Sequence, residues 1–101
     1  MSFYPDIDLT PDILSLVEPL VSKPEVIVIK RLDKEEERTN RDQHYLVLCD
    51  SNDVGKVVGR HGIISDSLRT LFNVSNKYGQ KRIHLRFDSL DSEIAKEYLD
   101  K

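Results

Sequence analysis

The chain has 101 residues, of which 39% are hydrophobic and 33% are charged, and its formal net charge is −3. This length suits one domain with one small core, and no apolar run approaches the roughly 18 residues that a membrane-spanning helix needs. The N-terminus lacks the basic and apolar regions of a secretory signal, and the single cysteine cannot form an internal disulfide, so we expect a cytoplasmic protein.

The first third of the chain predicts a helix followed by a strand. Residues 1–9 show no periodicity and are expected to form an N-terminal arm. A helix is predicted from Thr10, because a proline follows at the first helical position, and Pro19 is expected to kink or loosen its last turn. The β-branched run from Val26 to Leu32 predicts a strand.

The middle of the chain predicts a hairpin loop and a buried strand. The ten polar residues Asp33–Asp42, eight of them charged, predict a solvated loop. A loop that binds a partner through its acidic residues is the alternative. The next run, Gln43–Cys49, is mostly apolar on both faces and therefore predicts a central strand. An N-cap at Asn52 or Asp53 is expected to follow.

Two helical patterns then flank a pair of glycines. A short helix is predicted over Val54–Val58, and a long helix is predicted from about Ile63 to Lys77, where Gly79 suits the position after the helix end. The apolar stripe expected to face the core consists of Val54, Val57 and Val58 in the first helix and of Ile64, Leu68, Leu71 and Phe72 in the second.

The last part of the chain predicts a third strand and one more helix. In Lys81–Phe87, apolar and polar residues alternate, which indicates one buried and one solvated face. Ser89 or Asp91 is expected to cap a helical segment that contains Ile94 and Tyr98. The element order is therefore α-β-β-α-α-β with an extra C-terminal helix. We expect an α+β domain over residues 10–88 and a helical tail over residues 89–101.

The tight turn Gly59–Gly62 is the most informative feature for function. Glycine permits positive φ and close approach of another backbone, while Arg60 and His61 inside the turn are polar and basic. The start of the next helix adds free N–H groups and the positive end of its dipole, a combination that suits a phosphate group. From Val54 to Arg86 the chain has seven basic residues and one acidic residue, a local net charge of +6 within an acidic chain.

The segment Asp53–Arg69, with Val58-Gly59-Arg60-His61-Gly62 at its centre, resembles the GXXG segment of a KH domain. The similarity is to the KhpA family of small bacterial RNA-binding proteins with one KH domain, and it extends over Pro11–Phe87. It implies a type II-like KH fold, in which a three-stranded mixed sheet is backed by helices. Here Ile64 matches the bacterial pattern, whereas eukaryotic KH motifs often place that apolar residue where this chain has Ser65.

The resemblance implies binding of single-stranded RNA through its backbone, with low sequence specificity. The RNA-binding residues that it implies are Lys56, Gly59, Arg60, His61, Gly62, Ile64 and Arg69. Two alternatives are purely structural: Gly55 packs a helix closely on a neighbour, and Arg69 belongs to an ion pair. The resemblance also implies an RNA chaperone or post-transcriptional regulator that self-associates, pairs with a larger KH/Jag-type partner (KhpB) and is linked to cell elongation, cell shape and division.

Other chemistry finds little support in the sequence. Gly55-Lys56 lacks the spacing of a phosphate-binding P-loop, and His44, His61 and His84 lie too far apart for a metal site, so we expect no cofactor and no metal. Cys49 is expected to be a buried small hydrophobe. No serine has an evident base, and we therefore expect no enzyme. A protein–protein adaptor that has a KH fold but no RNA binding is the alternative function.

Overall fold

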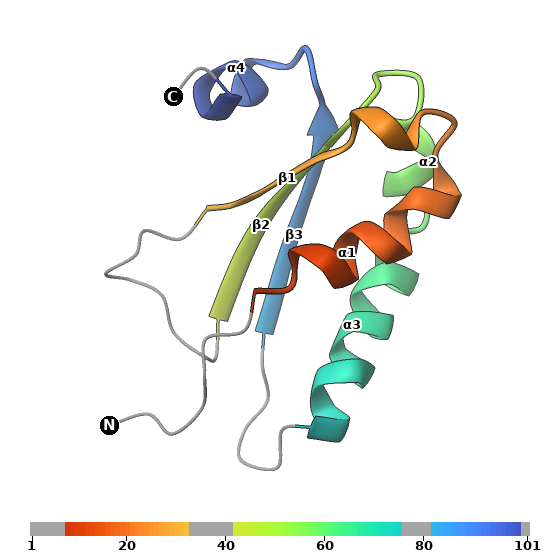
Figure 1. Cartoon of the computed structure of the whole chain (residues 1–101), viewed down its shortest axis with the longest axis vertical. Coiled ribbons are helices and arrows are strands. Elements are labelled where there is room, and N and C mark those ends of the chain that lie inside the picture. The colour runs from red at the N-terminus through yellow and green to blue at the C-terminus, as the bar shows by residue number, and fades with distance from the viewer. Residues whose placement is uncertain (1–7, 33–41, 76–81, 100–101) are drawn as a thin grey trace.

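A computed structural model describes residues 8–32, 42–75 and 82–99 (Figure 1). Its helices are α1 (Thr10–Val17), α2 (Val54–Val58), α3 (His61–Ser75) and α4 (Glu93–Leu99), and its strands are β1 (Val28–Arg31), β2 (Asp42–Cys49) and β3 (Arg82–Ser89). Short 3-10 turns at Glu18–Leu20 and Pro24–Val26 join α1 to β1. The predicted N-terminal arm up to residue 7, the loop at 33–41 and the helix end at Lys77 and Gly79 lie outside the described residues.

The three strands form one mixed sheet in the order β1-β2-β3. Strand β2 pairs antiparallel with β1 and parallel with β3. A parallel pair needs a crossover connection, and here α2 and α3 supply it. The α+β architecture, the mixed three-stranded sheet and the central position of the second strand are therefore confirmed.

The main core lies between α1, α3 and one face of the sheet, which we call the inner face (Figure 1). On β2, the alternation of side chains directs Tyr45, Val47 and Cys49 to this face. The buried residues from the other elements are Leu9, Ile13 and Val17, Val57, Ile64 and Leu68, and Ile83. Leu9, which was assigned to the N-terminal arm, has no exposed surface and belongs to this core.

The opposite face of the sheet, the outer face, is covered by α4 over part of its area. Leu46 and Leu48 of β2 are fully buried with Ala95 of α4, and Ile94 and Tyr98 pack against them. Figure 1 shows α4 at the end of the sheet where β3 finishes. The C-terminal helical segment thus stabilises the sheet on the side away from α1 and α3.

Several local expectations need correction. Helix α1 starts at Thr10, whose N–H donates to the Asp8 carboxylate at 3.0 Å, so the capping acceptor lies two residues earlier than predicted. Strand β1 begins only at Val28, because Pro24 opens a 3-10 turn. The hydroxyl of Ser92 accepts from the Ala95 N–H and caps α4, in place of Ser89 or Asp91. The expected loosening at Pro19 is confirmed, since α1 gives way to a 3-10 turn there.

The apolar stripe on the two crossover helices is narrower than predicted. Val57, Ile64 and Leu68 are buried, but Val58 and Leu71 are 51% and 54% exposed. The helical period alone placed them near the boundary of the buried face, and α1 covers only part of α3. The side chains of residues 72–75 lie outside the description.

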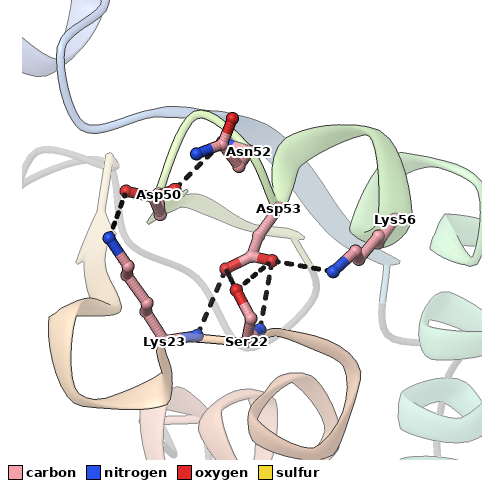
Figure 2. A network of polar contacts seen from close by, with 6 residues as sticks. All are labelled: Ser22, Lys23, Asp50, Asn52, Asp53 and Lys56. Atoms are coloured by element: carbon pink, nitrogen blue, oxygen red, sulfur yellow. Dashed lines mark hydrogen bonds and ion pairs between the residues drawn. The ribbon is translucent and has the colours of Figure 1, made fainter.

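The start of α2 is fixed by a buried carboxylate, that of Asp53 (Figure 2). It was predicted as an N-cap candidate, yet its side chain makes no capping hydrogen bond to its own helix. Instead its two oxygens accept from the N–H and hydroxyl of Ser22, at 3.1 Å and 2.9–3.0 Å, and from the N–H of Lys23 at 3.3 Å. The ammonium of Lys56 lies 3.4 Å away. This network ties the segment after α1 to the helix that leads into the glycine turn.

The donors around Asp53 also set its ionisation. Burial acts to raise the pKa of this carboxyl, but the N–H and hydroxyl of Ser22, the N–H of Lys23 and the Lys56 ammonium outweigh it and hold the pKa below its ordinary value. Because the pKa is lower in the folded than in the unfolded chain, the stabilisation is present above the unfolded pKa. It is lost as the pH falls through the folded pKa.

A second group of buried hydrogen bonds, centred on Tyr45, anchors the start of α1 to the sheet. The phenol oxygen of Tyr45 accepts from the N–H of Leu9 at 3.0 Å and donates to the amide oxygen of Gln43 at 2.8 Å. Gln43 and Tyr45 are both fully buried. The hydroxyl therefore satisfies a backbone donor and a side-chain acceptor inside the core.

Replacing Tyr45 with phenylalanine removes both of these hydrogen bonds while keeping the ring. We expect the free energy of unfolding to fall by about 1–3 kcal/mol, the typical cost of losing buried hydrogen bonds. Urea denaturation of the parent chain and of Tyr45→Phe measures this difference. An unchanged midpoint and slope would contradict the anchoring role of the hydroxyl.

Replacing Asp53 with asparagine should destabilise the fold more at pH 7 than at acid pH. The asparagine amide lacks the charge and brings donors of its own towards the N–H groups of Ser22 and Lys23. We expect the stability difference between the parent and Asp53→Asn to shrink as the pH falls below roughly 4, the ordinary aspartate pKa of the unfolded chain, and to be smallest once the folded carboxyl is also neutral. Denaturant unfolding at several pH values tests this, and a difference independent of pH would show that the charge contributes nothing.

Candidate nucleic-acid interface

The glycine turn is tighter than expected. Helix α2 ends at Val58, and Gly59 has right-handed torsions of φ −63° and ψ −17°. The Gly59 N–H donates to the Gly55 carbonyl at 3.1 Å, and the next helix begins at His61, so that Gly62 lies in its first turn. None of the glycines in the described ranges has positive φ. The turn therefore does not use the positive φ that glycine permits, since α2 runs almost directly into α3.

The space around the glycines is open. A Cβ atom built on Gly62 or Gly55 would have no neighbour within 4 Å, and one built on Gly59 would meet only the Gly55 carbonyl oxygen at 3.3 Å and that of Lys56 at 3.8 Å. All three glycines are exposed. The alternative in which Gly55 lets its helix pack closely on a neighbour is therefore wrong, and the missing side chains leave a bare backbone surface facing solvent.

The first turn of α3 carries free backbone donors. The Ile64 N–H donates to the Arg60 carbonyl at 3.1 Å, but the N–H groups of residues 61–63 have no acceptor within the described part of the chain. A helix leaves its first donors unsatisfied, and its dipole places partial positive charge at the same end. The 15-residue helix α3 therefore offers an anion site beside Gly62.

The two basic residues of the turn differ in their surroundings. Arg60 is exposed, and no acidic group lies within ion-pair distance of it among the residues described. His61 is half-buried, and the edge of its ring contacts Phe87 of β3 at a centroid distance of 5.0 Å and an interplanar angle of 86°. Its Nδ1 atom is buried without a hydrogen-bond partner. Arg60 therefore projects from the turn, while His61 joins the turn to the end strand of the sheet.

The remaining predicted site residues lie in three different environments. Lys56 is 58% exposed, and its ammonium lies 3.4 Å from the Asp53 carboxylate. The Arg69 guanidinium lies 3.8 Å from Asp66 on the same exposed helix surface, as the structural alternative expected. Ile64 is only 2% exposed and faces the core. The structure thus brings together residues 59–62, with Lys56 one turn before them and Arg69 two turns beyond.

Two features of this region were missed by the sequence analysis. The contact of His61 with Phe87 joins residues 26 positions apart, and only the alternation in β3 placed Phe87 on the inner face. The hold of Asp53 on Ser22 and Lys23 spans about 30 positions. The local sequence does not predict these distant partners, because Asp53 stands where an ordinary N-cap residue is expected.

The geometry suits binding of an anion and offers little for catalysis. In the described ranges, no group of three or more His, Cys, Asp or Glu side chains is placed to hold a metal ion. Cys49 is buried as expected; burial first, and then the nearby carboxylates of Asp53, Asp50 and Asp88, raise the pKa of its thiol, so that it stays protonated. No helix in the part of the chain that the structure describes has the length and apolar character needed to cross a membrane.

Comparison with known proteins agrees with this picture. The sequence model of the family described as "KhpA/KhpB, KH domain" matches residues 12–87. Among curated proteins, the chain is similar to "RNA-binding protein KhpA" of Oceanobacillus iheyensis, with 38% identity over 71 residues, or 70% of this chain and 88% of the relative. The protein of the same name from Listeria monocytogenes is 36% identical over 73 residues, or 72% of this chain and 90% of the relative.

A third relative with that name, from Streptococcus pneumoniae, is 35% identical over 72 residues, or 70% of this chain and 85% of the relative. No solved structure matched the chain with significant similarity. The family match runs from within α1 to within β3, includes both crossover helices and ends before α4. The chain therefore belongs to the KhpA/KhpB family of KH domains.

Proposed function

We propose that this protein binds single-stranded RNA by holding its sugar-phosphate backbone at the turn Gly59–Gly62, and that it acts as an RNA chaperone or post-transcriptional regulator. Relatives named RNA-binding protein KhpA support the ligand class. The proposed role is binding, which is what the names of these relatives describe. The link to cell elongation and division that the resemblance implies is part of the same proposal.

The observation that carries the proposal is the unexplained glycine at position 62. It lies in the first turn of a helix, where alanine is generally more stable by about 0.5–1 kcal/mol. Its torsions suit any residue, and a Cβ there would meet nothing within 4 Å. The fold itself therefore has no need for glycine, and close approach of a ligand from outside supplies the reason.

The charge and hydrogen-bond donors of the turn support a phosphate as that ligand. The free N–H groups of residues 61–63, the positive end of the α3 dipole and the exposed Arg60 converge on the same short segment. Lys56 and Arg69 add positive charge nearby, but each is already partly neutralised by an acid within 4 Å. The main phosphate contacts are accordingly assigned to the backbone of 61–63 and to Arg60.

The surface beside the turn suits bases. Leu85 and Phe87 of β3 are half-buried, and the ring edge of His61 lies on Phe87. Because β3 is the end strand of the three described, its outer edge has backbone donors and acceptors that no neighbouring strand takes. A strand of RNA held at the turn would lay its bases on this apolar strip, with those backbone groups in reach for hydrogen bonding.

Self-association through α1 and α3 is a second part of the proposal. Ile63 and Leu71 are 67% and 54% exposed on α3, and together with Leu16 of α1 they line a mainly apolar groove of about 550 Å³. Exposed apolar surface of this kind marks contact sites between proteins. We assign it to a second copy of this chain, or to the KH domain of a KhpB-type partner that takes the copy's place.

Gly62→Ala tests the RNA proposal, with Gly55→Ala as the matched control. Both substitutions add one methyl group in open space on a helix, so both should leave the melting temperature equal or slightly higher. Gly62→Ala should weaken binding of a short unstructured oligoribonucleotide by about tenfold, or about 1.4 kcal/mol, because the methyl group stands where the backbone of the ligand approaches. Gly55→Ala should bind like the parent.

Fluorescence anisotropy at fixed salt concentration measures both affinities. Equal binding by Gly62→Ala and the parent would remove the turn from the site. If the parent itself does not bind RNA, the adaptor function becomes the better account.

Leu71→Ser tests self-association, with Leu99→Ser as the control because Leu99 is an exposed leucine on α4. Sedimentation equilibrium of the parent should show a dimer that dissociates on dilution. Leu71→Ser should raise the dissociation constant several-fold, since it removes apolar area from the proposed contact, and Leu99→Ser should not. A parent chain that stays monomeric at high micromolar concentration would contradict this part of the proposal.

A further inference from the structure

The outer face of the sheet carries a group of basic side chains beyond the area that α4 covers. In the pairing register, Lys30 of β1 and Arg86 of β3 lie on either side of the buried Leu46. In the next row along the strands, His44 lies beside His84. These four basic residues, which we call the outer basic patch, are all exposed and lie on the side of the sheet away from the main core.

The charges of this patch are less neutralised than those near the glycine turn. Within the described ranges, no acidic group lies within ion-pair distance of Lys30 or Arg86, whereas Lys56 and Arg69 each have one. Although the formal net charge of the chain is −3, these two cations share one surface with no acidic partner in ion-pair distance among the described residues. Such a local excess of positive charge attracts a polyanion.

The two histidines add flat surface to the charge. Their rings stack with centroids 4.3 Å apart and an angle of 8° between the planes. An exposed stack of flat rings is a surface on which an unpaired base can continue the stacking. A metal ion is a poorer fit, because the nitrogen lone pairs lie in two parallel planes and do not converge on one point.

The dimensions of the patch suit one or two nucleotides. Two strand spacings separate Lys30 from Arg86, about 10 Å, and two residues along a strand add about 7 Å. Towards α4 the character changes, because Asp88, Glu93 and Glu97 line a groove of about 710 Å³ together with Arg86, Ile94 and Lys96. These carboxylates repel a phosphate chain, so they limit the patch on that side.

We propose that the outer basic patch is a second contact surface for single-stranded RNA, with Lys30 and Arg86 on phosphates and the stacked His44 and His84 under a base. The inference rests on the proposed RNA-binding function and extends it to the opposite side of the sheet. A short oligonucleotide held at the glycine turn does not reach this patch. A longer strand engages both surfaces, and the second contact then occurs at high effective concentration.

The test compares two unstructured RNAs, one of about five nucleotides and one of about 30. The double variant Lys30→Gln/Arg86→Gln keeps the fold, because both side chains are exposed on a solvated surface. It should bind the short RNA within about twofold of the parent and the long RNA about three- to tenfold more weakly. The slope of log K against log salt concentration for the long RNA should fall by roughly 1.4, which corresponds to two lost phosphate contacts.

Lys30→Gln alone and Lys23→Gln form the matched control pair, since each removes one exposed lysine. Lys23 lies beside Asp50, at the loop that Figure 2 shows, and not in the patch. Lys30→Gln should weaken binding of the long RNA, and Lys23→Gln should not. NMR signals of the His44 and His84 rings should shift with the long RNA only.

If the double variant and the parent bind the long RNA with equal affinity and equal salt slope, the proposal is overturned. An acidic protein surface then becomes the better candidate ligand of the patch. Equal losses with Lys23→Gln and Lys30→Gln would also overturn the proposal, because the effect would then come from net charge alone. Gly62→Ala separates the two proposals. If it binds both RNAs like the parent while the double variant still loses affinity for the long RNA, the turn assignment fails and the outer basic patch stands.

Discussion

The parallel pairing of β2 with β3 is the constraint on which the rest of the structure depends. Two parallel strands cannot be joined by a tight turn, so the chain must cross over and return along the sheet. Helices α2 and α3 make this crossover, and the break between them falls beside β3. The same pairing that forms the sheet therefore places a bare backbone corner, a helix N-terminus and an end strand next to one another. The burial of Asp53 fixes the entry to this crossover, because one carboxylate holds both α2 and the segment after α1.

Much of the fold could be predicted from the sequence because it depends on the period of apolar residues. The apolar residues on both faces of Gln43–Cys49 predicted the central strand, and in the structure each face of β2 contributes to one of the two hydrophobic clusters of the described residues. The expectations that failed concern side chains whose surroundings are set by distant elements. The carboxylate of Asp53 accepts from the distant Ser22 and makes no capping hydrogen bond to α2, and Leu71 stays exposed because α1 covers only part of α3. Both depend on which elements meet in space.

At the candidate site, too, some features could be predicted from the sequence and others could not. Gly59–Gly62 stands out in the sequence because two glycines flank two basic residues between helical patterns. Of the two properties of glycine that the sequence analysis named, positive φ is not used, since the chain passes from α2 to α3 in right-handed torsions. The glycine at position 62 has no positive φ and no close neighbour within the protein. Such a glycine indicates a ligand more specifically than a glycine in a strained turn would. The acidic partners of Lys56 and Arg69 could not be found by counting basic residues over the segment.

The distribution of charge argues for weak contacts used in combination. A clamp at one turn covers few phosphates, and two of the nearby cations are shared with carboxylates, so the electrostatic part of binding at the turn is small. Among the described residues, the cations without an acidic partner in ion-pair distance include Arg60 at the turn and Lys30 and Arg86 on the far side of the sheet. Under the two proposals, a strand that follows the molecule from one side to the other would gain from both sets of contacts, each of which is weak alone. On these proposals the chain would bind short anions weakly and favour long, unpaired RNA, because only such a ligand can reach both surfaces at once.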